Sequence, residues 1–366
     1  MVQTIIRDNL ADDPKQEAYY AYVITLVGRK TTDVFPTLKH IKSNNGTDTD
    51  EIIKEHINNG HNFSHHTSQE QKITSRHHTF KSADNTLKIT EWHVKDSDIE
   101  HNSDYPNFIS PTCKSLCANE TKERLIQHIS LWNSYIKTVD KINQRNVSNN
   151  DPAIDLNNRF VIITEDDNTF NNPELLKPLI LSMNTNNIDI IQLGDSSSPI
   201  GQSLSSLTPL VQNPPIYGYL GGLDFNLSSY IIRVSTMINL YKKIISTGGA
   251  SAGLSLEISR LEKELGVTRY ILSDSTVIVT HEPYYRVRAR LMNTTGCFWK
   301  KMGLWLSKWY PKIVYFSTTP VFSIMGLFDI DIIDIFIIMY IFLLMIFYIN
   351  IPILWFIGGM LITAIV

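Results

Sequence analysis

Three consecutive carboxylates, Glu165, Asp166 and Asp167, follow a run of five apolar or β-branched residues at 160–164. Such a run is typical of a buried strand in an α/β sheet, and ligands bind outside the carboxyl ends of such strands. Adjacent carboxylates repel one another, and a hard divalent cation such as Mg²⁺ or Mn²⁺ would neutralise them. The motif therefore predicts either a metal site that takes a phosphate-bearing substrate or a solvated acidic turn.

Basic and imidazole side chains follow two other expected strands. Residues 18–28 predict the first apolar strand, and Arg29 directly after it could meet a diphosphate or be solvated in a loop. His281 ends the last expected strand, 276–281, where it could be a ligand or an ordinary loop residue. Both alternatives stay open from the residues alone.

The elements that must position these groups are indicated by hydrophobic periodicity. Residues 120–139 predict a helix whose apolar side chains form one stripe, and His128 borders that stripe and is expected to point inward. The strand at 160–164, a helix at 173–183 and a second buried strand at 188–195 predict a right-handed βαβ unit. A mixed or parallel α/β sheet is therefore expected.

The segment 43–110 is polar, rich in His, Asn and Ser, and weakly periodic, which predicts a surface insertion. Its histidines lack the spacing of a metal site with a carboxylate partner. Within the insertion, residues 87–94 alternate in the manner of an edge strand.

Charge and cysteine content exclude some classes of protein. The 366 residues carry a formal net charge of −3, which argues against nucleic acid as a partner. Cys113, Cys117 and Cys297 are too few for a disulfide framework and are expected to be reduced thiols. No N-terminal signal segment is expected, because the first residues are polar and acidic.

The C-terminal segment predicts attachment to a membrane. No charged residue occurs from 335 to 366, and a continuous helix of that length would be about 48 Å long, against roughly 30 Å for the hydrocarbon core. A transmembrane anchor of one or two helices is therefore expected within 313–366. Its natural break is 350–352, which would give either a hairpin of two helices or one full span followed by a shorter re-entrant or tilted piece. Residues 297–312 predict an amphipathic interfacial helix with Trp on one face and Lys on the other. Basic residues just before the apolar run indicate that the preceding domain faces the cytosol.

Several motifs between residues 18 and 285 resemble glycosyltransferase family 25, which includes lipopolysaccharide glycosyltransferases and collagen galactosyltransferases. The opening strand with Thr25 and Arg29, the helix segment 127–132 with His128, and the acidic motif 163–167 are each similar to family landmarks. Segments 188–194 and 229–240 resemble later ones. The sequence departs from the family in lacking its Gly-Cys before the His helix and in carrying the insertion at 43–110.

The resemblance implies a GT-A fold, a nucleotide-sugar donor and Mn²⁺ or Mg²⁺. It implies that Asp167 is the preferred metal ligand, with Glu165 in the first acidic place of the motif and His281 completing the coordination. The metal would hold the donor diphosphate and neutralise the leaving nucleotide.

The remaining roles concern the donor and the acceptor. Asp166 would support the metal or contact the ribose, and Thr25 and Arg29 belong to the donor-binding strand and turn. An acceptor hydroxyl needs a base, for which Asp195 and Asp224 are candidates, and His128 matches the family's histidine.

The sequence thus predicts an α/β protein with a Rossmann-like mixed sheet of GT-A type over residues 1–296, followed by the interfacial helix and the transmembrane anchor. The predicted function is transfer of a sugar from a nucleotide donor to a glycan, lipid-linked or protein acceptor at a lipid bilayer. One alternative is a catalytically inactive domain of the same type that serves as a membrane-bound structural or interaction protein. Another is a metal-dependent phosphotransferase or nuclease, which lacks support because no P-loop is present.

Overall fold

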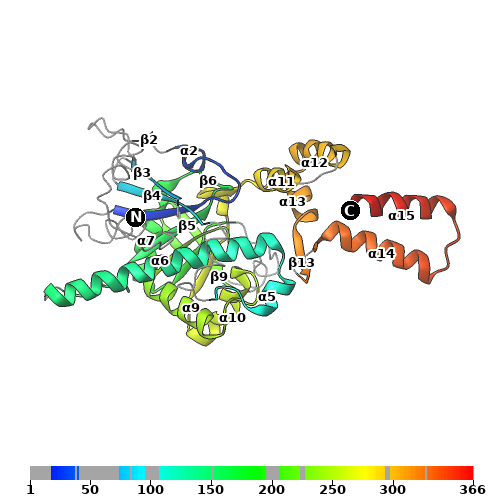
Figure 1. Ribbon diagram of the computed structural model, residues 1–366. Coiled ribbons are helices and arrows are strands. Elements are labelled where there is room, and N and C mark those ends of the chain that lie inside the picture. The colour runs from blue at the N-terminus through cyan, green and yellow to red at the C-terminus, as the bar shows by residue number, and fades with distance from the viewer. Residues whose placement is uncertain are drawn as a thin grey trace, which may run out of the picture.

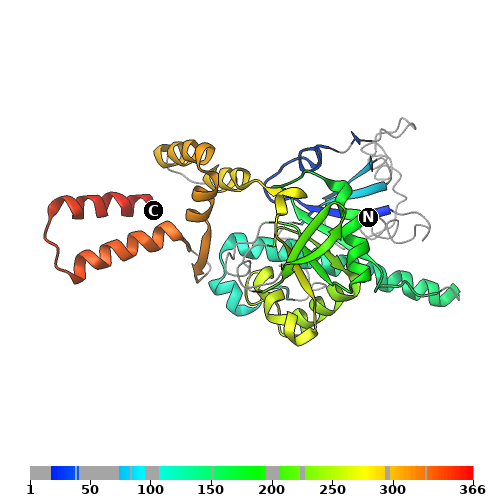
Figure 2. The ribbon, with the colours of Figure 1, turned by 180° about the vertical axis from the view of Figure 1, so that it is seen from behind.

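A computed structural model describes ten stretches of the chain: residues 18–37, 39–40, 74–82, 85–94, 107–149, 152–194, 207–222, 227–292, 297–325 and 328–365. They form an α/β domain from which a C-terminal arm extends to one side (Figure 1). Figure 2 shows the same arm from behind, and in both views it points away from the sheet.

A ten-stranded mixed sheet forms the centre of the domain, with the strand order β2-β3-β4-β1-β5-β10-β7-β11-β9-β8. Strand β1 pairs in parallel with both β4 and β5, whereas β10 is antiparallel to both β5 and β7. The strands are β1 Ala18–Ile24, β2 Lys39–His40, β3 Thr74–Ser82, β4 Asn85–His93, β5 Phe160–Glu165, β7 Ile190–Gln192, β8 Thr208–Gln212, β9 Pro215–Leu220, β10 Ser229–Arg233 and β11 Arg269–Leu272. The predicted mixed α/β sheet is confirmed.

Two layers of helices cover the sheet, because successive side chains of a strand point to opposite faces. Tyr22 and Ile24 lie in the cluster with α6 (Asn119–Asn149), α9 (Val234–Ser246) and α10 (Leu254–Leu265). Ala21 and Val23 lie in the cluster with α7 (Leu176–Thr185) on the other face. Helix α7 and the short 3₁₀ turn η1 before it (Pro173–Leu175) connect β5 to β7, and β10 lies between those two strands.

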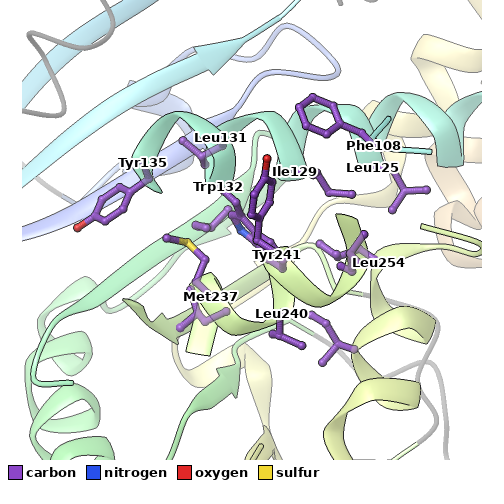
Figure 3. Packing of buried hydrophobic residues seen from close by; sticks show 14 of the residues in the cluster. Phe108, Leu125, Ile129, Leu131, Trp132, Tyr135, Met237, Leu240, Tyr241 and Leu254 are labelled. Carbon is purple, nitrogen blue, oxygen red and sulfur yellow. The ribbon is translucent and has the colours of Figure 1, made fainter. Parts of the chain in front are cut away.

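Helix α6 carries the apolar stripe that the sequence predicts, and it is longer than the predicted 120–139. Its side chains pack against α9 and α10 (Figure 3). The stripe consists of Leu125, Ile129, Trp132 and Ile136, all buried. The C-terminal end of α6 extends beyond the domain on the side away from the arm (Figure 1).

The predicted edge strand at 87–94 is wrong in its position. Strand β4 lies between β3 and β1, with β3 antiparallel and β1 parallel to it, and it is therefore an interior strand. Leu87, Ile89 and Trp92 are all buried, Trp92 in the cluster on the α6 face of the sheet and Leu87 and Ile89 in the cluster on the other face. Residues 43–73, 83–84 and 95–106 of the predicted insertion lie outside the described residues.

The cysteine prediction is also wrong, since Cys113 and Cys117 form a disulfide. Cys113 lies in the short helix α5 (Pro111–Leu116), and Cys117 is the residue that ends this helix. Four residues of separation are enough to bring the two sulfurs together once the helical turn places them on one side.

The C-terminal arm is a series of short elements. It consists of α11 Pro283–Met292, α12 Cys297–Trp309, α13 Pro311–Ser317, β13 Pro320–Ile324, β14 Phe328–Asp331, α14 Ile332–Ile346 and α15 Pro352–Ile365. Strands β13 and β14 pair with each other, and α14 and α15 form a hairpin at the far end of the arm (Figure 1).

The predicted transmembrane anchor at 313–366 is wrong. The apolar run is divided between α14, with 15 residues, and α15, with 14 residues, which correspond to lengths of about 22 and 21 Å. Pro352 begins α15 after a turn, since proline cannot continue the preceding helix. Among the residues that the structure describes, no helix is both long enough and apolar enough to cross a membrane.

Candidate functional site

The acidic motif lies where the sequence places it, at the carboxyl ends of two neighbouring strands. Strands β1 and β5 are parallel and adjacent, so the residues that follow them meet at one edge of the sheet. Glu165 ends β5, and the backbone N–H of Asp166 donates to the carbonyl of Ile24 at 3.0 Å. All three acids are buried, with at most 1% of each exposed, so the alternative of a solvated acidic turn is wrong.

Asp166 holds the loop that follows β1. Its carboxylate accepts hydrogen bonds from the backbone N–H groups of Leu26, Val27 and Arg29 at 2.9–3.1 Å. The Arg29 side chain turns back to donate to the carbonyls of Asp166 and Asn168, both at 3.2 Å. Asp166 and Arg29, which were both predicted to bind the nucleotide-sugar donor, are hydrogen-bonded to each other and fix the loop at this edge of the sheet.

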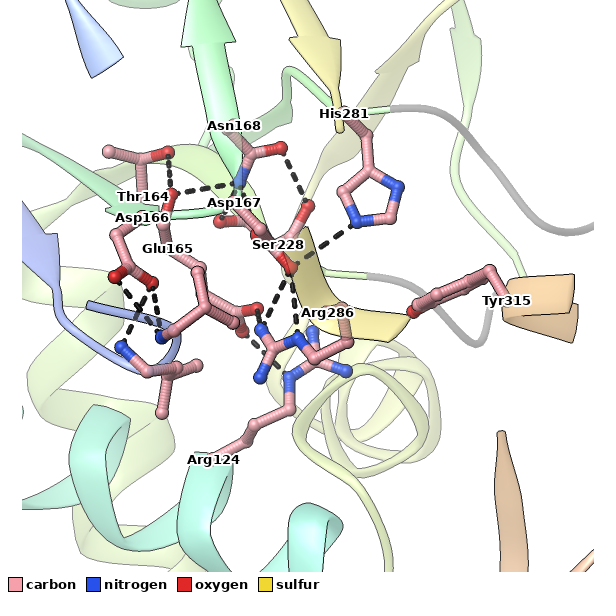
Figure 4. Close-up of polar contacts among 12 residues, drawn as sticks. Arg124, Thr164, Glu165, Asp166, Asp167, Asn168, Ser228, His281, Arg286 and Tyr315 are labelled. Atoms are coloured by element: carbon pink, nitrogen blue, oxygen red, sulfur yellow. Dashed lines mark hydrogen bonds and ion pairs between the residues drawn. The ribbon is translucent and has the colours of Figure 1, made fainter. Parts of the chain in front are cut away.

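Glu165 and Asp167 are bridged by Arg286 of α11 (Figure 4). The Arg286 guanidinium donates to Glu165 Oε2 at 2.8 Å and, through Nε, to Asp167 Oδ2 at 3.0 Å. Arg286 itself is buried. One internal cation therefore contacts both carboxylates at the centre of the motif.

Helix α6 supplies a second set of partners to Glu165. Arg124 Nε donates to Glu165 Oε1 at 2.8 Å, and His128 Nε2 lies 3.1 Å from the same oxygen. The other ring nitrogen of His128 lies 2.9 Å from Tyr230 Oη, which also accepts from Trp132 Nε1 at 3.3 Å. Because the Glu165 carboxylate only accepts, a neutral His128 donates through Nε2 and accepts the Tyr230 hydroxyl hydrogen at Nδ1.

His281 reaches Asp167 through a small second sheet. Strands β6 (Asn168–Phe170) and β12 (Val279–His281) pair so that His281 lies opposite Asn168. The Nε2 atom of His281 lies 3.4 Å from Asp167 Oδ2, and its ring packs edge-on against Tyr315 of α13. His281 and Asp167, both predicted as ligands of one metal ion, thus contact each other directly, and their role as metal ligands stays a prediction.

A further ion pair extends the cluster into the arm. Glu120 at the start of α6 accepts from Arg290 of α11 at 2.6 and 3.0 Å, and Arg286 Nε lies 3.7 Å from the same carboxylate. The Arg290 guanidinium also lies over the Tyr315 ring, 4.8 Å from its centroid. We refer to Glu120, Arg124, His128, Glu165, Asp167, His281, Arg286 and Arg290 as the charge cluster.

Burial and ion pairing have opposite effects on the carboxyl groups of the charge cluster. Burial alone would raise the pKa of Asp167, but Arg286 and His281 outweigh burial and hold this pKa far below its ordinary value. Burial likewise opposes ionisation of Glu165, while Arg124, His128 and Arg286 keep its pKa lowered. Burial lowers the pKa of His128, which favours the neutral ring. By contrast, burial raises the pKa of Asp166 despite its three backbone donors.

The arrangement does not fit a divalent cation as it stands. Both predicted carboxylate ligands already contact Arg286, so a metal ion on Asp167 would have to displace a buried guanidinium. Among the described residues, no group of three or more His, Cys, Asp or Glu side chains is placed to hold a metal ion. The predictions of Mn²⁺ or Mg²⁺ and of a nucleotide-sugar donor stay untested.

Other predicted site residues are not part of the charge cluster. Thr25 makes a backbone contact with the neighbouring strand, donating from its N–H to the carbonyl of Trp92 at 3.0 Å. The two candidate bases, Asp195 and Asp224, lie outside the described residues.

Four members of the charge cluster, Glu120, Arg124, Arg286 and Arg290, were not predicted as site residues, and their spacing in the sequence was the available signal. Glu120 and Arg124 are four residues apart, in line with His128, and therefore share one face of α6. Arg286 and Arg290 have the same spacing on α11 and both turn inward, whereas Arg288 between them is exposed. The basic residues before the apolar run are thus divided between a buried ion-paired face and an exposed one.

Together, the fold and the charge cluster define a mixed α/β protein. Arginines of the same chain contact the acids at the end of β5, and an apolar arm follows the α/β domain. The chain belongs to the poxvirus P35 protein family, whose sequence model matches residues 12–366. It is 34% identical over 266 residues to "Envelope protein H3" of Vaccinia virus (strain Copenhagen), covering 73% of this chain and 78% of that protein. It is 33% identical over 266 residues to "Envelope protein OPG108" of Monkeypox virus, covering 73% and 78%. It is 26% identical over 355 residues to "Immunodominant envelope protein p35" of Fowlpox virus (strain NVSL), covering 94% and 97%.

These matches overturn the assignment to glycosyltransferase family 25 and, with it, the predicted transferase activity. The family is a poxvirus family, and the three relatives are named as viral envelope proteins. The similarity to family 25 rested on short strand and helix motifs, and such motifs recur wherever an apolar strand ends in polar residues. The alternative of a non-catalytic structural or interaction protein agrees better with these relatives.

Proposed function

We propose that this chain is a poxvirus envelope protein whose α/β domain is a structural or interaction module and whose α14–α15 hairpin attaches it to the lipid of the envelope. The names of the relatives support the envelope assignment. The observation that carries the lipid attachment is the surface of the hairpin, where large apolar side chains point outward on both helices.

The hairpin has no charged residue after Asp334. Among the side chains of 332–360, which the structure describes, the apolar ones that are at least half exposed are Phe336, Ile338, Phe342, Met345, Ile346, Phe347, Tyr348, Ile351, Ile353 and Phe356. Each exposed apolar Å² costs about 25 cal/mol in water, and continuous apolar patches of this kind mark membrane or protein contacts. Lipid would remove this cost from both helices at once.

The hairpin is held together by contacts between its own helices. Tyr340 Oη donates to the carbonyl of Leu354 at 3.1 Å, and Trp355 Nε1 donates to the carbonyl of Ile349 at 2.7 Å. Gly358 is buried, and a Cβ there would lie 3.7 Å from the Tyr340 ring. These contacts join α15 to α14 and to the turn between them, and they leave the outward apolar side chains available to lipid.

The charge cluster supports a non-catalytic role for the α/β domain. Its carboxylates are paired with arginines, two of which, Arg286 and Arg290, come from the arm itself. The cluster therefore joins the domain to the segment that leads to the hairpin. In this proposal the acids fix the position of the arm.

Flotation of the purified full chain with phosphatidylcholine vesicles tests the lipid attachment. The wild-type chain should float with the vesicles, whereas Ile338→Glu with Phe342→Glu should remain at the bottom of the gradient. The matched control, Val147→Glu with Leu181→Glu, changes two exposed apolar residues outside the arm and should float like the wild type. Equal flotation of both double variants would contradict the proposal.

A further inference from the structure

Helix α12 has an exposed face on which lysine and tryptophan alternate. Lys301, Trp305, Lys308 and Trp309 are all exposed, with 59% of Trp305 and 68% of Trp309 accessible. At 100° per residue these four positions fall within about a third of the helix circumference. The sequence predicts Trp and Lys on opposite faces of this helix, and that prediction is wrong.

The opposite side of α12 is fixed against α11. Gly303 allows this close approach, because a Cβ at that position would lie 2.9 Å from Leu291 Cδ1. Ser307 on the same helix is buried and donates its hydroxyl hydrogen to the carbonyl of Leu304 at 2.9 Å. The orientation of α12 on the arm therefore turns the lysines and tryptophans outward.

Helix α13 continues the same type of surface. Ile313 and Phe316 are exposed by 66% and 65%, Lys312 is exposed, and Val314 is buried on the inner side. Tyr315 on α13 packs on Arg290 and His281, which ties the helix to the charge cluster. Residues 297–317 contain four lysines and no acidic residue, so this surface is positively charged.

We infer that the exposed faces of α12 and α13 bind the anionic headgroups of a phospholipid bilayer. Tryptophan is enriched at the level of lipid headgroups, and lysines near a bilayer are attracted to anionic lipid. The inference rests on the proposed attachment through α14–α15: the hairpin provides burial in hydrocarbon, and α12 and α13 provide preference for negatively charged lipid.

The test compares binding of the full chain to vesicles of phosphatidylcholine alone and to vesicles that also contain phosphatidylserine. The wild-type chain should bind the anionic vesicles more tightly, and this gain should shrink as salt screens the charges. Lys301→Gln with Lys308→Gln should weaken binding to anionic vesicles by about 25-fold, since each lysine near the surface contributes roughly fivefold. Binding to neutral vesicles should be unchanged.

The matched control is Lys242→Gln with Lys263→Gln, which removes two exposed lysines from α9 and α10. This control should keep the preference for anionic vesicles. Equal binding of wild type to both vesicle types, or an equal loss in control and test variants, would overturn the inference while leaving the hairpin attachment intact. A change in self-association of Lys301→Gln with Lys308→Gln without lipid would also overturn it, because the face would then contact another protein copy. Failure of the wild-type chain to bind either vesicle would instead contradict the proposed function.

Discussion

At the scale of single residues, the charge cluster balances the charge of two buried acids, Glu165 and Asp167. The three acids Glu120, Glu165 and Asp167 contact the three arginines Arg124, Arg286 and Arg290. A buried ion is costly unless it is paired and hydrogen-bonded. The pairing therefore offsets the free-energy cost of burying the charges. Removing one partner should lower the free energy of unfolding by more than the intact pair contributes to it.

We expect Arg286→Leu to lower the free energy of unfolding by about 3–5 kcal/mol, because it leaves Glu165 and Asp167 buried without their shared cation. Urea unfolding followed by circular dichroism measures this change. Arg288→Leu, two residues away on the exposed side of α11, is the control and should change the free energy by about 0.5 kcal/mol or less. Similar losses in both variants would show that Arg286 does not neutralise buried acids.

Stability should fall on acidification. The pKa values of Glu120, Glu165 and Asp167 are lowered in the folded protein, so their contribution is complete above the ordinary values of 4.5, 4.5 and 3.8 and is lost as pH falls below them. Burial also lowers the pKa of His128 from 6.5, so the unfolded chain takes up its proton first and stability declines below that pH. Asp166, whose pKa is raised, acts in the opposite direction.

Urea titrations at several pH values test this dependence. The free energy of unfolding should decrease from pH 7 to pH 4, and His128→Asn should reduce the part of the decrease that lies between pH 6.5 and pH 5. An unchanged slope in that range would show that His128 titrates alike in the folded and unfolded chains.

At the scale of elements, the local pattern of apolar residues was sufficient to predict a helix or strand that buries its apolar side chains. The apolar stripe of α6 and the β-branched run of β5 identified both elements and the inward position of His128. Periodicity says nothing about a contact such as Asp167 with Arg286, which are 119 residues apart. It also failed for β4, because an alternation of polar and apolar residues does not tell whether a strand has neighbours on one side or on both.

The apolar C-terminal run shows the same limit. Its composition predicts a bilayer-length stretch with a break at 350–352, and the turn before Pro352 divides it there into two helices that pack on each other. A hydropathy pattern reports that side chains prefer an apolar environment, and it does not report whether the chain crosses that environment or turns back. The exposed surface of the hairpin could be found only from the structure.

The connection between α9 and the segment before α5 depends on one glycine. Gly249 has φ +101°, and a Cβ there would lie 2.7 Å from both the Asn107 carbonyl oxygen and the Ile109 carbonyl carbon. Gly248, with φ +88°, has open space around it. We expect Gly248→Ala to cost about 1 kcal/mol from backbone conformation alone and Gly249→Ala to cost at least about 2 kcal/mol, since the backbone must also shift.

Thermal unfolding of the two variants measures the difference. The melting temperature of Gly249→Ala should be clearly the lower of the two, because the neighbouring hydrogen bond from Ala250 N–H to the Phe108 carbonyl is also disturbed. Equal melting temperatures would mean that the segment at 107–109 moves aside without cost.

At the scale of the whole molecule, the start of α6 is where the domain holds the arm. Asp329 of β14 accepts the backbone N–H of Asn119 at 3.1 Å, and Glu120 pairs with Arg290 of α11. Negative charge at a helix N-terminus is stabilising, so both acids suit this position. The α/β domain, the lysine and tryptophan face of α12, and the hairpin are thereby connected through α11 and the charge cluster.

The most direct test of this account is the environment of the hairpin when the full chain is bound to vesicles. Spin labels are placed one at a time through Phe342→Cys, Phe356→Cys and, as a control outside the arm, Val147→Cys, each in a Cys297→Ser background. Relaxation by oxygen, which concentrates in hydrocarbon, is compared with relaxation by a water-soluble nickel complex. We predict that labels at positions 342 and 356 respond to oxygen and are shielded from nickel, whereas the label at position 147 responds to nickel. Strong relaxation of the hairpin labels by nickel on bound vesicles would contradict attachment through α14–α15.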